Sequence, residues 1–297
     1  MNATPAPAQA LPAGSYTDQF WTSQDGLKLH YRDYSGPADR PVVLCLPGLT
    51  RNARDFAHVA QRLGGKWRVV CPDLRGRGDS AYAKDPASYN PLQYVEDMGA
   101  LFDQAGIERF VGFGTSLGGL MTMIMAITMP DRLVGALLND VGPEVSPEGL
   151  ERIRSYVGQG RSFPTWMHAA RALEEAQGLV FPDYSASQWL GVAKRCMVVG
   201  SNGRIVFDYD MRIAEPLSQP GGQSGADLWP AFQALTGKPV ALLRGELSDV
   251  LSADVFARMA KALPQAEAVT VPRVGHAPML DEAAAASAID RLLARVA

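Results

Sequence analysis

The chain has 297 residues, of which 47% are apolar, and its formal net charge is −3. A chain of this length and composition can bury one substantial hydrophobic core. Charges of both signs are interspersed without a basic stripe, so we expect no nucleic-acid partner.

The N-terminal segment and the cysteines indicate a cytoplasmic protein. Residues 1–15 are rich in Pro and Ala and have neither a positive segment nor an apolar run, which predicts a disordered tail instead of an export signal. No apolar run reaches about 18 residues, so we expect no membrane span. Three cysteines are too few, and odd in number, for a disulfide framework, and their apolar surroundings are typical of reduced thiols.

Periodicity predicts an α/β fold with a mostly parallel sheet flanked by helices. Residues 20–34 alternate between apolar and polar around an Asp25-Gly26 turn, which predicts a hairpin with His30 on its polar face. Continuous apolar runs follow, typical of strands buried on both faces, at 42–46, 67–71, 110–114, 134–138, 240–244 and 268–271. Helices are predicted between them at 53–63, 90–106 and 117–129.

The strand-helix alternation breaks between residues 146 and 225. Three helical stretches occur there, at 147–157, 164–177 and 186–196, with no strand predicted among them. The glycine-rich segment 218–225 predicts a linker. We therefore expect a core formed by 16–145 and 226–297, with a helical cap formed by 146–225.

The segment "VGFGTSLGGLM" predicts a nucleophilic serine. Ser116 lies between Gly114 and Gly118, after a buried strand and before an apolar helix, and this strand-turn-helix context is what a nucleophile elbow requires. A tight elbow leaves no room for a Cβ atom at either glycine. The alternative is a structural serine in a glycine-rich turn.

A serine hydroxyl needs a base, and that base needs a carboxylate. His276 follows the last buried strand, on the same sheet edge as the elbow, and is the predicted base. Asp249, beyond the strand 240–244, is the predicted acid because it gives the chain order Ser, Asp, His on three separate loops. Asp140, beyond the strand 134–138, is the alternative.

An acyl-transfer reaction also needs two N–H donors for the developing oxyanion. We expect them from the backbones of Leu117, directly after the nucleophile, and of Leu49, in the loop after the first buried strand. The mechanism needs no cofactor, and the histidines and cysteines are too scattered to predict a metal site.

Candidate substrate contacts come from the Leu49 loop and from the cap. Arg51 is a candidate to hold a substrate carboxylate, against the alternative of a solvated surface arginine. The candidates for an apolar pocket, against the alternative of packing within the cap, are Phe163, Trp166, Met167 and Trp189.

With these motifs in place, the chain resembles the α/β-hydrolase superfamily, most of all serine hydrolases with a helical cap such as esterases, enol-lactonases and C–C bond hydrolases. The resemblance covers about residues 20–297 and rests on "GTSLGG", "PDLRGRGDS", "RGELSD" and the Gly275-His276 pair. It implies that Asp73 and Arg75 belong to the scaffold. Many relatives have His-Gly where this chain has Pro47-Gly48, and Ser116 argues against the dehalogenases and epoxide hydrolases that use an aspartate nucleophile.

The sequence thus predicts a hydrolase of carboxylic esters or lactones that forms an acyl-enzyme intermediate. Two alternatives remain open, namely a C–C bond hydrolase of ring-cleavage products and a non-catalytic ligand-binding protein of the same fold. We expect a small-molecule substrate, no membrane partner, and a monomer or homodimer.

Overall fold

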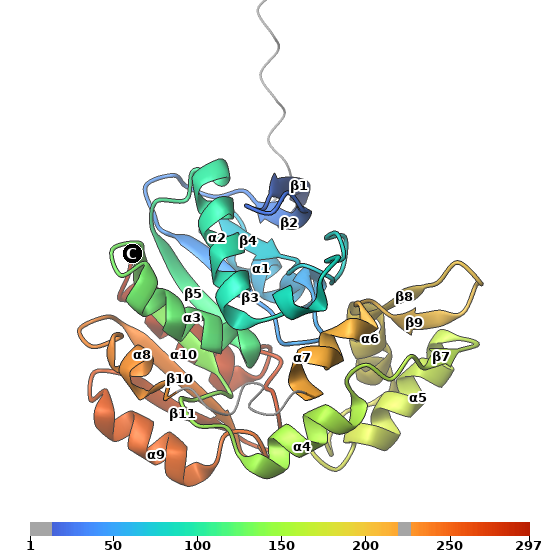
Figure 1. Ribbon diagram of the computed structural model, residues 1–297. Coiled ribbons are helices and arrows are strands. Elements are labelled where there is room, and N and C mark those ends of the chain that lie inside the picture. Colours follow the sequence, from blue (N-terminus) through green and yellow to red (C-terminus); the bar gives the residue numbers. More distant parts are fainter. Residues whose placement is uncertain (1–13, 219–226) are drawn as a thin grey trace, which may run out of the picture.

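The computed structural model describes residues 14–218 and 227–297. Its central element is an eight-stranded sheet with the order β1-β2-β4-β3-β5-β6-β10-β11 (Figure 1). Strands β1 (Tyr16–Thr22) and β2 (Lys28–Tyr34) form the predicted hairpin, and β2 pairs antiparallel with β4. Every other neighbouring pair in this sheet is parallel. The predicted fold class is therefore confirmed.

The parallel strands correspond to the predicted apolar runs. They are β3 (Val42–Leu46), β4 (Val69–Pro72), β5 (Phe110–Thr115), β6 (Leu133–Asn139), β10 (Val240–Gly245) and β11 (Glu267–Val271). Successive residues of a strand point to opposite faces, so a continuous apolar run supplies two cores at once. In β3, Leu44 belongs to one buried cluster, whereas Val43 and Cys45 belong to the other.

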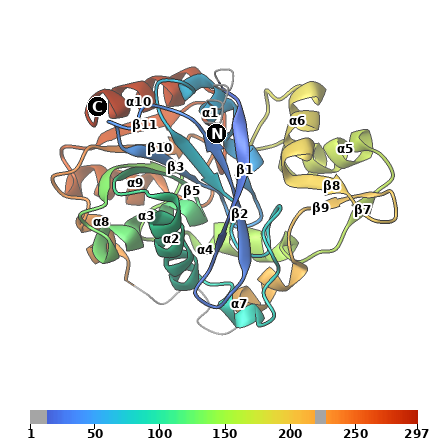
Figure 2. The ribbon, with the colours of Figure 1, turned by 90° about the horizontal axis from the view of Figure 1, so that it is seen from above.

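Helices cover both faces of the sheet, as Figure 2 shows from above. One cluster contains side chains of α2 (Pro91–Ala105), α3 (Leu117–Thr128), α8 (Trp229–Gln233) and α9 (Ala253–Ala262). The other contains side chains of α1 (Ala57–Leu63), which follows a 3-10 turn at Ala53–Phe56, and of α10 (Ala283–Ala294). Helix α2 begins as predicted, with the Asn90 side chain accepting the N–H of Gln93.

Residues 147–218, which we call the cap segment, lie between β6 and α8. They contain the helices α4 (Pro147–Tyr156), α5 (Trp166–Gln177), α6 (Ala186–Cys196) and α7 (Ala214–Ser218). Figures 1 and 2 both show α5 and α6 beyond the edge of the large sheet. The predicted tail, except for its last two residues, and nearly all of the predicted linker lie outside the described residues.

The expectation of no strand in the cap segment is wrong. A small antiparallel sheet with the order β7-β9-β8 is present, formed by β7 (Ser162–Phe163), β9 (Ile205–Phe207) and β8 (Met197–Val199). Strands of two or three residues are too short to produce a readable alternation, because a period of two needs about four residues to be recognised. Within the described ranges, no helix is long and apolar enough to cross a membrane.

Candidate active site

Ser116 occupies a strained turn between β5 and α3. Its backbone has φ 53° and ψ −116°, in a region that residues with a side chain rarely adopt. A Cβ atom at Gly114 would overlap the carbonyl oxygen of Gly118, and one at Gly118 would overlap that of Leu46. The glycines of the motif therefore allow the turn to pack against its neighbours while the Ser116 side chain lines a cavity.

Three loops at the carboxyl ends of β5, β6 and β11 bring Ser116, Asp140 and His276 together. His276 Nε2 lies 2.9 Å from Ser116 Oγ, and Nδ1 of the same ring lies 2.8 Å from Asp140 Oδ2. Because parallel strands end at the same edge of a sheet, residues far apart in sequence meet there. The predicted contact between Ser116 and His276 is thus present.

The carboxylate at His276 belongs to Asp140 and not to Asp249. Asp140 is fully buried, directly follows β6, and accepts hydrogen bonds from the N–H of Gly245 at 2.8 Å and from Ser248 Oγ at 2.6 Å. Gly245 donates to Oδ1, whereas Ser248 and the imidazole of His276 share Oδ2. The carboxylate is therefore held by three partners from two other loops.

The expected placement of Asp249 against His276 is corrected by the structure. Asp249 lies past the turn that follows β10, and its carboxylate forms a two-point ion pair with Arg152 of α4, including a 2.9 Å contact from Nη2. Burial favours a higher pKa for Asp249, but the hydrogen bond and charge of Arg152 outweigh it and lower the pKa. Ser248, the residue before Asp249, is the one that contacts the buried carboxylate of Asp140.

The loop after β3 folds back onto the elbow. A Cβ atom built at Gly48 would lie 3.7 Å from Cβ of Ser116, so the neighbouring peptide of Leu49 lies close to the serine. The Leu49 carbonyl accepts a 2.9 Å hydrogen bond from Nε of Arg77, a buried guanidinium that also donates to the Tyr94 hydroxyl. Leu117 is the first residue of α3, where backbone N–H groups lack helical partners. Both backbones thus remain candidates for holding an oxyanion.

A cavity of about 280 Å³ opens above the elbow, between the core and the cap segment. Ser116 and His276 line it together with residues of the Leu49 loop, the β11–α10 loop and the cap segment. The cap segment contributes Arg152, Ile153, Ser155, Tyr156, Gln159, Arg161, Phe163, Ala172, Leu173, Ala176, Gln177, Cys196, Phe207 and Tyr209. The cavity is therefore partly apolar and partly lined by charged and hydroxyl groups.

Of the five candidate substrate contacts, Arg51 and Phe163 line this cavity, whereas Trp166, Met167 and Trp189 are not among its lining residues within the described chain. Trp189 is 1% exposed and packs against the rings of Phe181 and Tyr184, so it belongs to the interior of the cap segment. Met167 is exposed. Trp166 packs against the buried cluster that includes the cap residues. Composition did not show which face of each helix meets the cavity.

Arg51 is not a solvated surface arginine. Its guanidinium forms a two-point ion pair with Asp55, with Nε 2.6 Å from Oδ2, and both side chains are less than one-fifth exposed. Burial would raise the pKa of Asp55, but the charge of Arg51 outweighs it and lowers that pKa. The polar cavity residues that sequence reasoning missed, such as Tyr156 and Gln159, lie on or near α4, whose mostly polar sequence is typical of an exposed helix.

The other three histidines lie away from Ser116. Nε2 of His58 is 2.7 Å from the carbonyl oxygen of Met279, and burial lowers the pKa of this histidine. His168 is exposed beside Thr165. His30, expected on a polar face, is 1% exposed, because the ring of Phe20 lies beside it at 5.2 Å and both of its ring nitrogens contact carboxylates.

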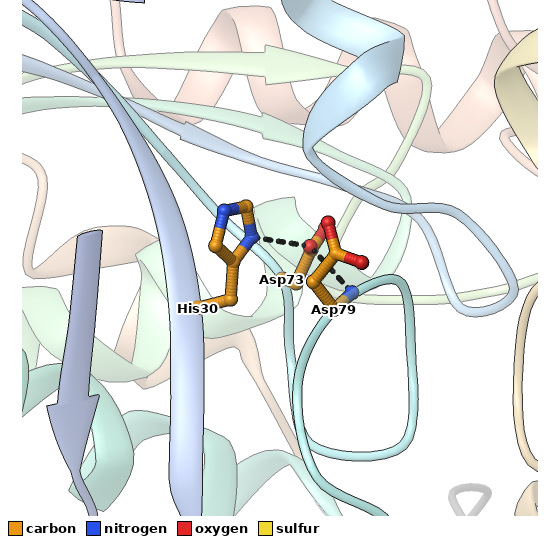
Figure 3. A group of neighbouring side chains, drawn as sticks. All are labelled: His30, Asp73 and Asp79. Carbon is orange, nitrogen blue, oxygen red and sulfur yellow. Dashed lines mark hydrogen bonds and ion pairs between the residues drawn. The ribbon is translucent and has the colours of Figure 1, made fainter. Parts of the chain in front are cut away.

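Within the described ranges, one group has the donor types that a metal ion takes, formed by His30, Asp73 and Asp79 (Figure 3). Nδ1 of His30 lies 2.7 Å from Oδ2 of Asp73, which also accepts the backbone N–H of Asp79 at 3.0 Å. Oδ1 of Asp73 accepts the N–H of Ala53 at 2.6 Å, beyond the Leu49 loop. Asp73 therefore ties three backbone segments together, which suits a scaffold role, and its oxygens already have partners.

Arg75 likewise has a structural environment. It is fully buried and forms ion pairs with Asp97 at 2.6 Å and with Asp25 at 2.9 Å. A buried guanidinium requires such partners, because an uncompensated charge away from water is costly. Neither Asp73 nor Arg75 lines the cavity in the described structure.

Comparisons with known proteins agree with this architecture. A family model described as "Alpha/beta hydrolase family" matches residues 43–289. The 3-hydroxybutyrate-oligomer hydrolase of Cupriavidus necator is 37% identical over 258 residues, which are 84% of this chain and 87% of that protein. The 2-(acetamidomethylene)succinate hydrolase of Mesorhizobium japonicum is 25% identical over 240 residues, 80% and 81% of the two chains. The crystal structure of an alpha/beta hydrolase from Novosphingobium aromaticivorans has 63% sequence identity and a TM-score of 0.92, and the match covers 95% of this chain and 99% of that one.

Proposed function

We propose that this chain, which belongs to the alpha/beta hydrolase family as its motifs predicted, hydrolyses carboxylic esters with Ser116 as nucleophile. The observation that carries the proposal is the hydrogen-bonded series Ser116, His276 and Asp140, of which Ser116 and His276 line the cavity and Asp140 lies buried behind the imidazole. A serine attacks an acyl carbon when a base accepts its proton, and Nε2 of His276 is within hydrogen-bond reach.

The reaction follows from this arrangement. His276 accepts the Ser116 proton while Oγ attacks the ester carbonyl, and Asp140 holds the imidazole in the required tautomer and stabilises its positive charge. The backbone N–H groups of Leu49 and Leu117 stabilise the oxyanion. His276 then protonates the departing alkoxide, and the acyl group stays on Oγ. Water, deprotonated by the same histidine, attacks the acyl-enzyme and releases the acid.

The substrate that we propose is a short ester of a hydroxy acid, such as a dimer or trimer of 3-hydroxybutyrate. The 3-hydroxybutyrate-oligomer hydrolase named above supports this class through 37% identity over most of both chains. A cavity of about 280 Å³ with mixed polar and apolar walls is compatible with a small, compact substrate. The same chemistry opens a lactone, whose ester bond lies within a ring.

The test compares wild-type protein with Ser116→Ala and with Ser155→Ala, a second serine that lines the cavity and whose hydroxyl donates to the Arg152 carbonyl. We expect Ser116→Ala to lower kcat for the 3-hydroxybutyrate dimer by at least about four orders of magnitude, while Ser155→Ala stays within about tenfold. A fluorophosphonate probe should label every form except Ser116→Ala.

Two results would count against the proposal. Folded wild-type protein that resists the probe, under conditions that label a control esterase, would favour a non-catalytic ligand-binding protein. Turnover of a vinylogous diketone without turnover of any ester or lactone would favour C–C bond hydrolysis. Both assays use the full chain, with thermal unfolding as the check on folding.

A further inference from the structure

Positively charged side chains outnumber negatively charged ones in the lining of the cavity. Among the described residues, those that line it include the three arginines Arg51, Arg152 and Arg161 but a single carboxylate, Asp55. A cleft whose lining has an excess of guanidinium groups favours an anionic ligand, because the protein walls screen the charges less than bulk water does. This excess calls for a comparison of the three arginines.

Two of these arginines already have carboxylate partners in the protein. Arg51 is held by Asp55 through two contacts, and Arg152 is held by Asp249 through two contacts. A guanidinium engaged at two points with a carboxylate has its fork of donors largely occupied. Neither side chain is therefore well placed to bind a second carboxylate without giving up its first.

Arg161 differs from both. It follows α4 in the chain, is exposed, and its guanidinium lies 5.5 Å from the ring centroid of Phe163, another residue of the cavity wall. In the part of the chain that the structure describes, no carboxylate lies within 4.0 Å of it. The aromatic ring supports the guanidinium from one side and leaves its N–H donors available.

We propose that Arg161 binds the free carboxylate of the substrate and so selects the acid over its neutral esters. The proposal rests on the proposed function, because a short oligomer of a hydroxy acid has a carboxylate at one end and ester bonds behind it. Planar guanidinium and carboxylate groups match at two donor-acceptor pairs, which adds orientation to affinity. Arg161 would then be a specificity-determining residue of the cap segment.

The experiment separates binding from turnover. Three proteins are compared, all with Ser116→Ala so that the ligand is not hydrolysed. They are the protein with no further change, the variant with Arg161→Gln, and the control variant with Arg171→Gln. Calorimetry measures the affinity of each for the 3-hydroxybutyrate dimer and for the methyl ester of that dimer. Arg171 is an exposed arginine of α5 that is not among the described cavity residues. We expect Arg161→Gln to reduce the preference for the acid over the methyl ester by about tenfold, since a hydrogen bond to a charged group is lost. Arg171→Gln should leave the preference unchanged.

The proposal would be overturned if Arg161→Gln left the ratio of the affinities for the acid and the methyl ester unchanged, whether both affinities stayed the same or both fell equally. In protein that retains Ser116, Arg161→Gln should raise KM for the acid by a larger factor than it lowers kcat. Failure of the proposed function appears elsewhere, as absence of ester turnover and of probe labelling in wild-type protein. If wild-type protein turns over the methyl ester as readily as the acid, the proposed esterase activity stands and the proposed carboxylate site at Arg161 is wrong.

Discussion

Replacing Asp140 by Asn tests the most specific feature of the proposed mechanism, the identity of the carboxylate that orients His276. Oδ1 of Asp140 accepts the N–H of Gly245, so the amide oxygen of an asparagine would keep that position. The NH2 group would then occupy the place of Oδ2, where Nδ1 of His276 lies at 2.8 Å. Because an amide NH2 can only donate, Nδ1 would have to accept, and the ring proton would move to Nε2. His276 could then no longer take the proton of Ser116.

The magnitude follows from this change of tautomer. In a serine protease, replacing the aspartate that orients the catalytic histidine by asparagine lowers kcat by about 10⁴, which corresponds to about 5.5 kcal/mol of transition-state stabilisation. Asp249→Asn is the matched variant. It disturbs an ion pair whose two side chains are each 31% exposed, and such pairs contribute at most about 1 kcal/mol. Because the Asp249 carboxylate is hydrogen-bonded to Arg152 and not to His276 or Ser116, we expect Asp249→Asn to change kcat by less than about tenfold.

The assay is the initial rate of hydrolysis of the 3-hydroxybutyrate dimer and of a short-chain aryl ester, with thermal unfolding measured for both variants. If Asp140→Asn, folded as wild type, keeps a kcat within about tenfold of it, the assignment of Asp140 is wrong. A loss in Asp249→Asn as large as that in Asp140→Asn would also refute the reasoning, since it would restore the acid expected from the sequence.

Two further predictions concern stability. Gly118→Ala places a Cβ atom onto the Leu46 carbonyl oxygen, whereas a Cβ atom at Gly160 meets no atom within 4 Å. We expect Gly118→Ala to lower Tm by roughly 3 to 10 °C and Gly160→Ala to leave it nearly unchanged. Equal melting temperatures of the two variants would contradict the packing argument. Burial alone would lower the pKa of His30, but Asp73 and Asp18 outweigh it and raise the pKa above its ordinary value. Because protonated His30 is favoured in the folded state, it stabilises that state fully below about pH 6.5, and this stabilisation is lost as the pH rises through the pKa of the folded state. The difference in unfolding free energy between wild type and His30→Gln should therefore be larger at about pH 5.5 than at about pH 9.5. A difference that stays constant or grows with pH would contradict this prediction.

Much of the core could be predicted because its signals are local. A continuous apolar run in β3 or β5 means that both faces of the strand are covered, whatever covers them. Asn90 followed by Pro91 marks the start of α2 for reasons contained within one helical turn. The glycines beside Ser116 likewise mark a turn that brings backbones close together.

The cap segment was less readable from the sequence. Its strands are two or three residues long, below the length at which alternation is recognisable. Trp189 and Phe163 are similar in character, yet one packs inside the cap segment and the other lines the cavity. Apolar residues of a helix or loop show that a face is covered, but they do not show which neighbour covers it.

The sequence by itself determined the fold, and it predicted that Ser116 and His276 meet at one edge of the sheet, because strand burial, backbone sterics at the elbow and the common direction of parallel strands leave few other arrangements. The tertiary structure decided which carboxylate meets that histidine. Asp140 and Asp249 both follow strands at the same edge, and chain order does not separate them. The choice depends on three contacts between loops distant in sequence, those of Gly245, Ser248 and His276 with Asp140, and on the ion pair that holds Asp249 at Arg152.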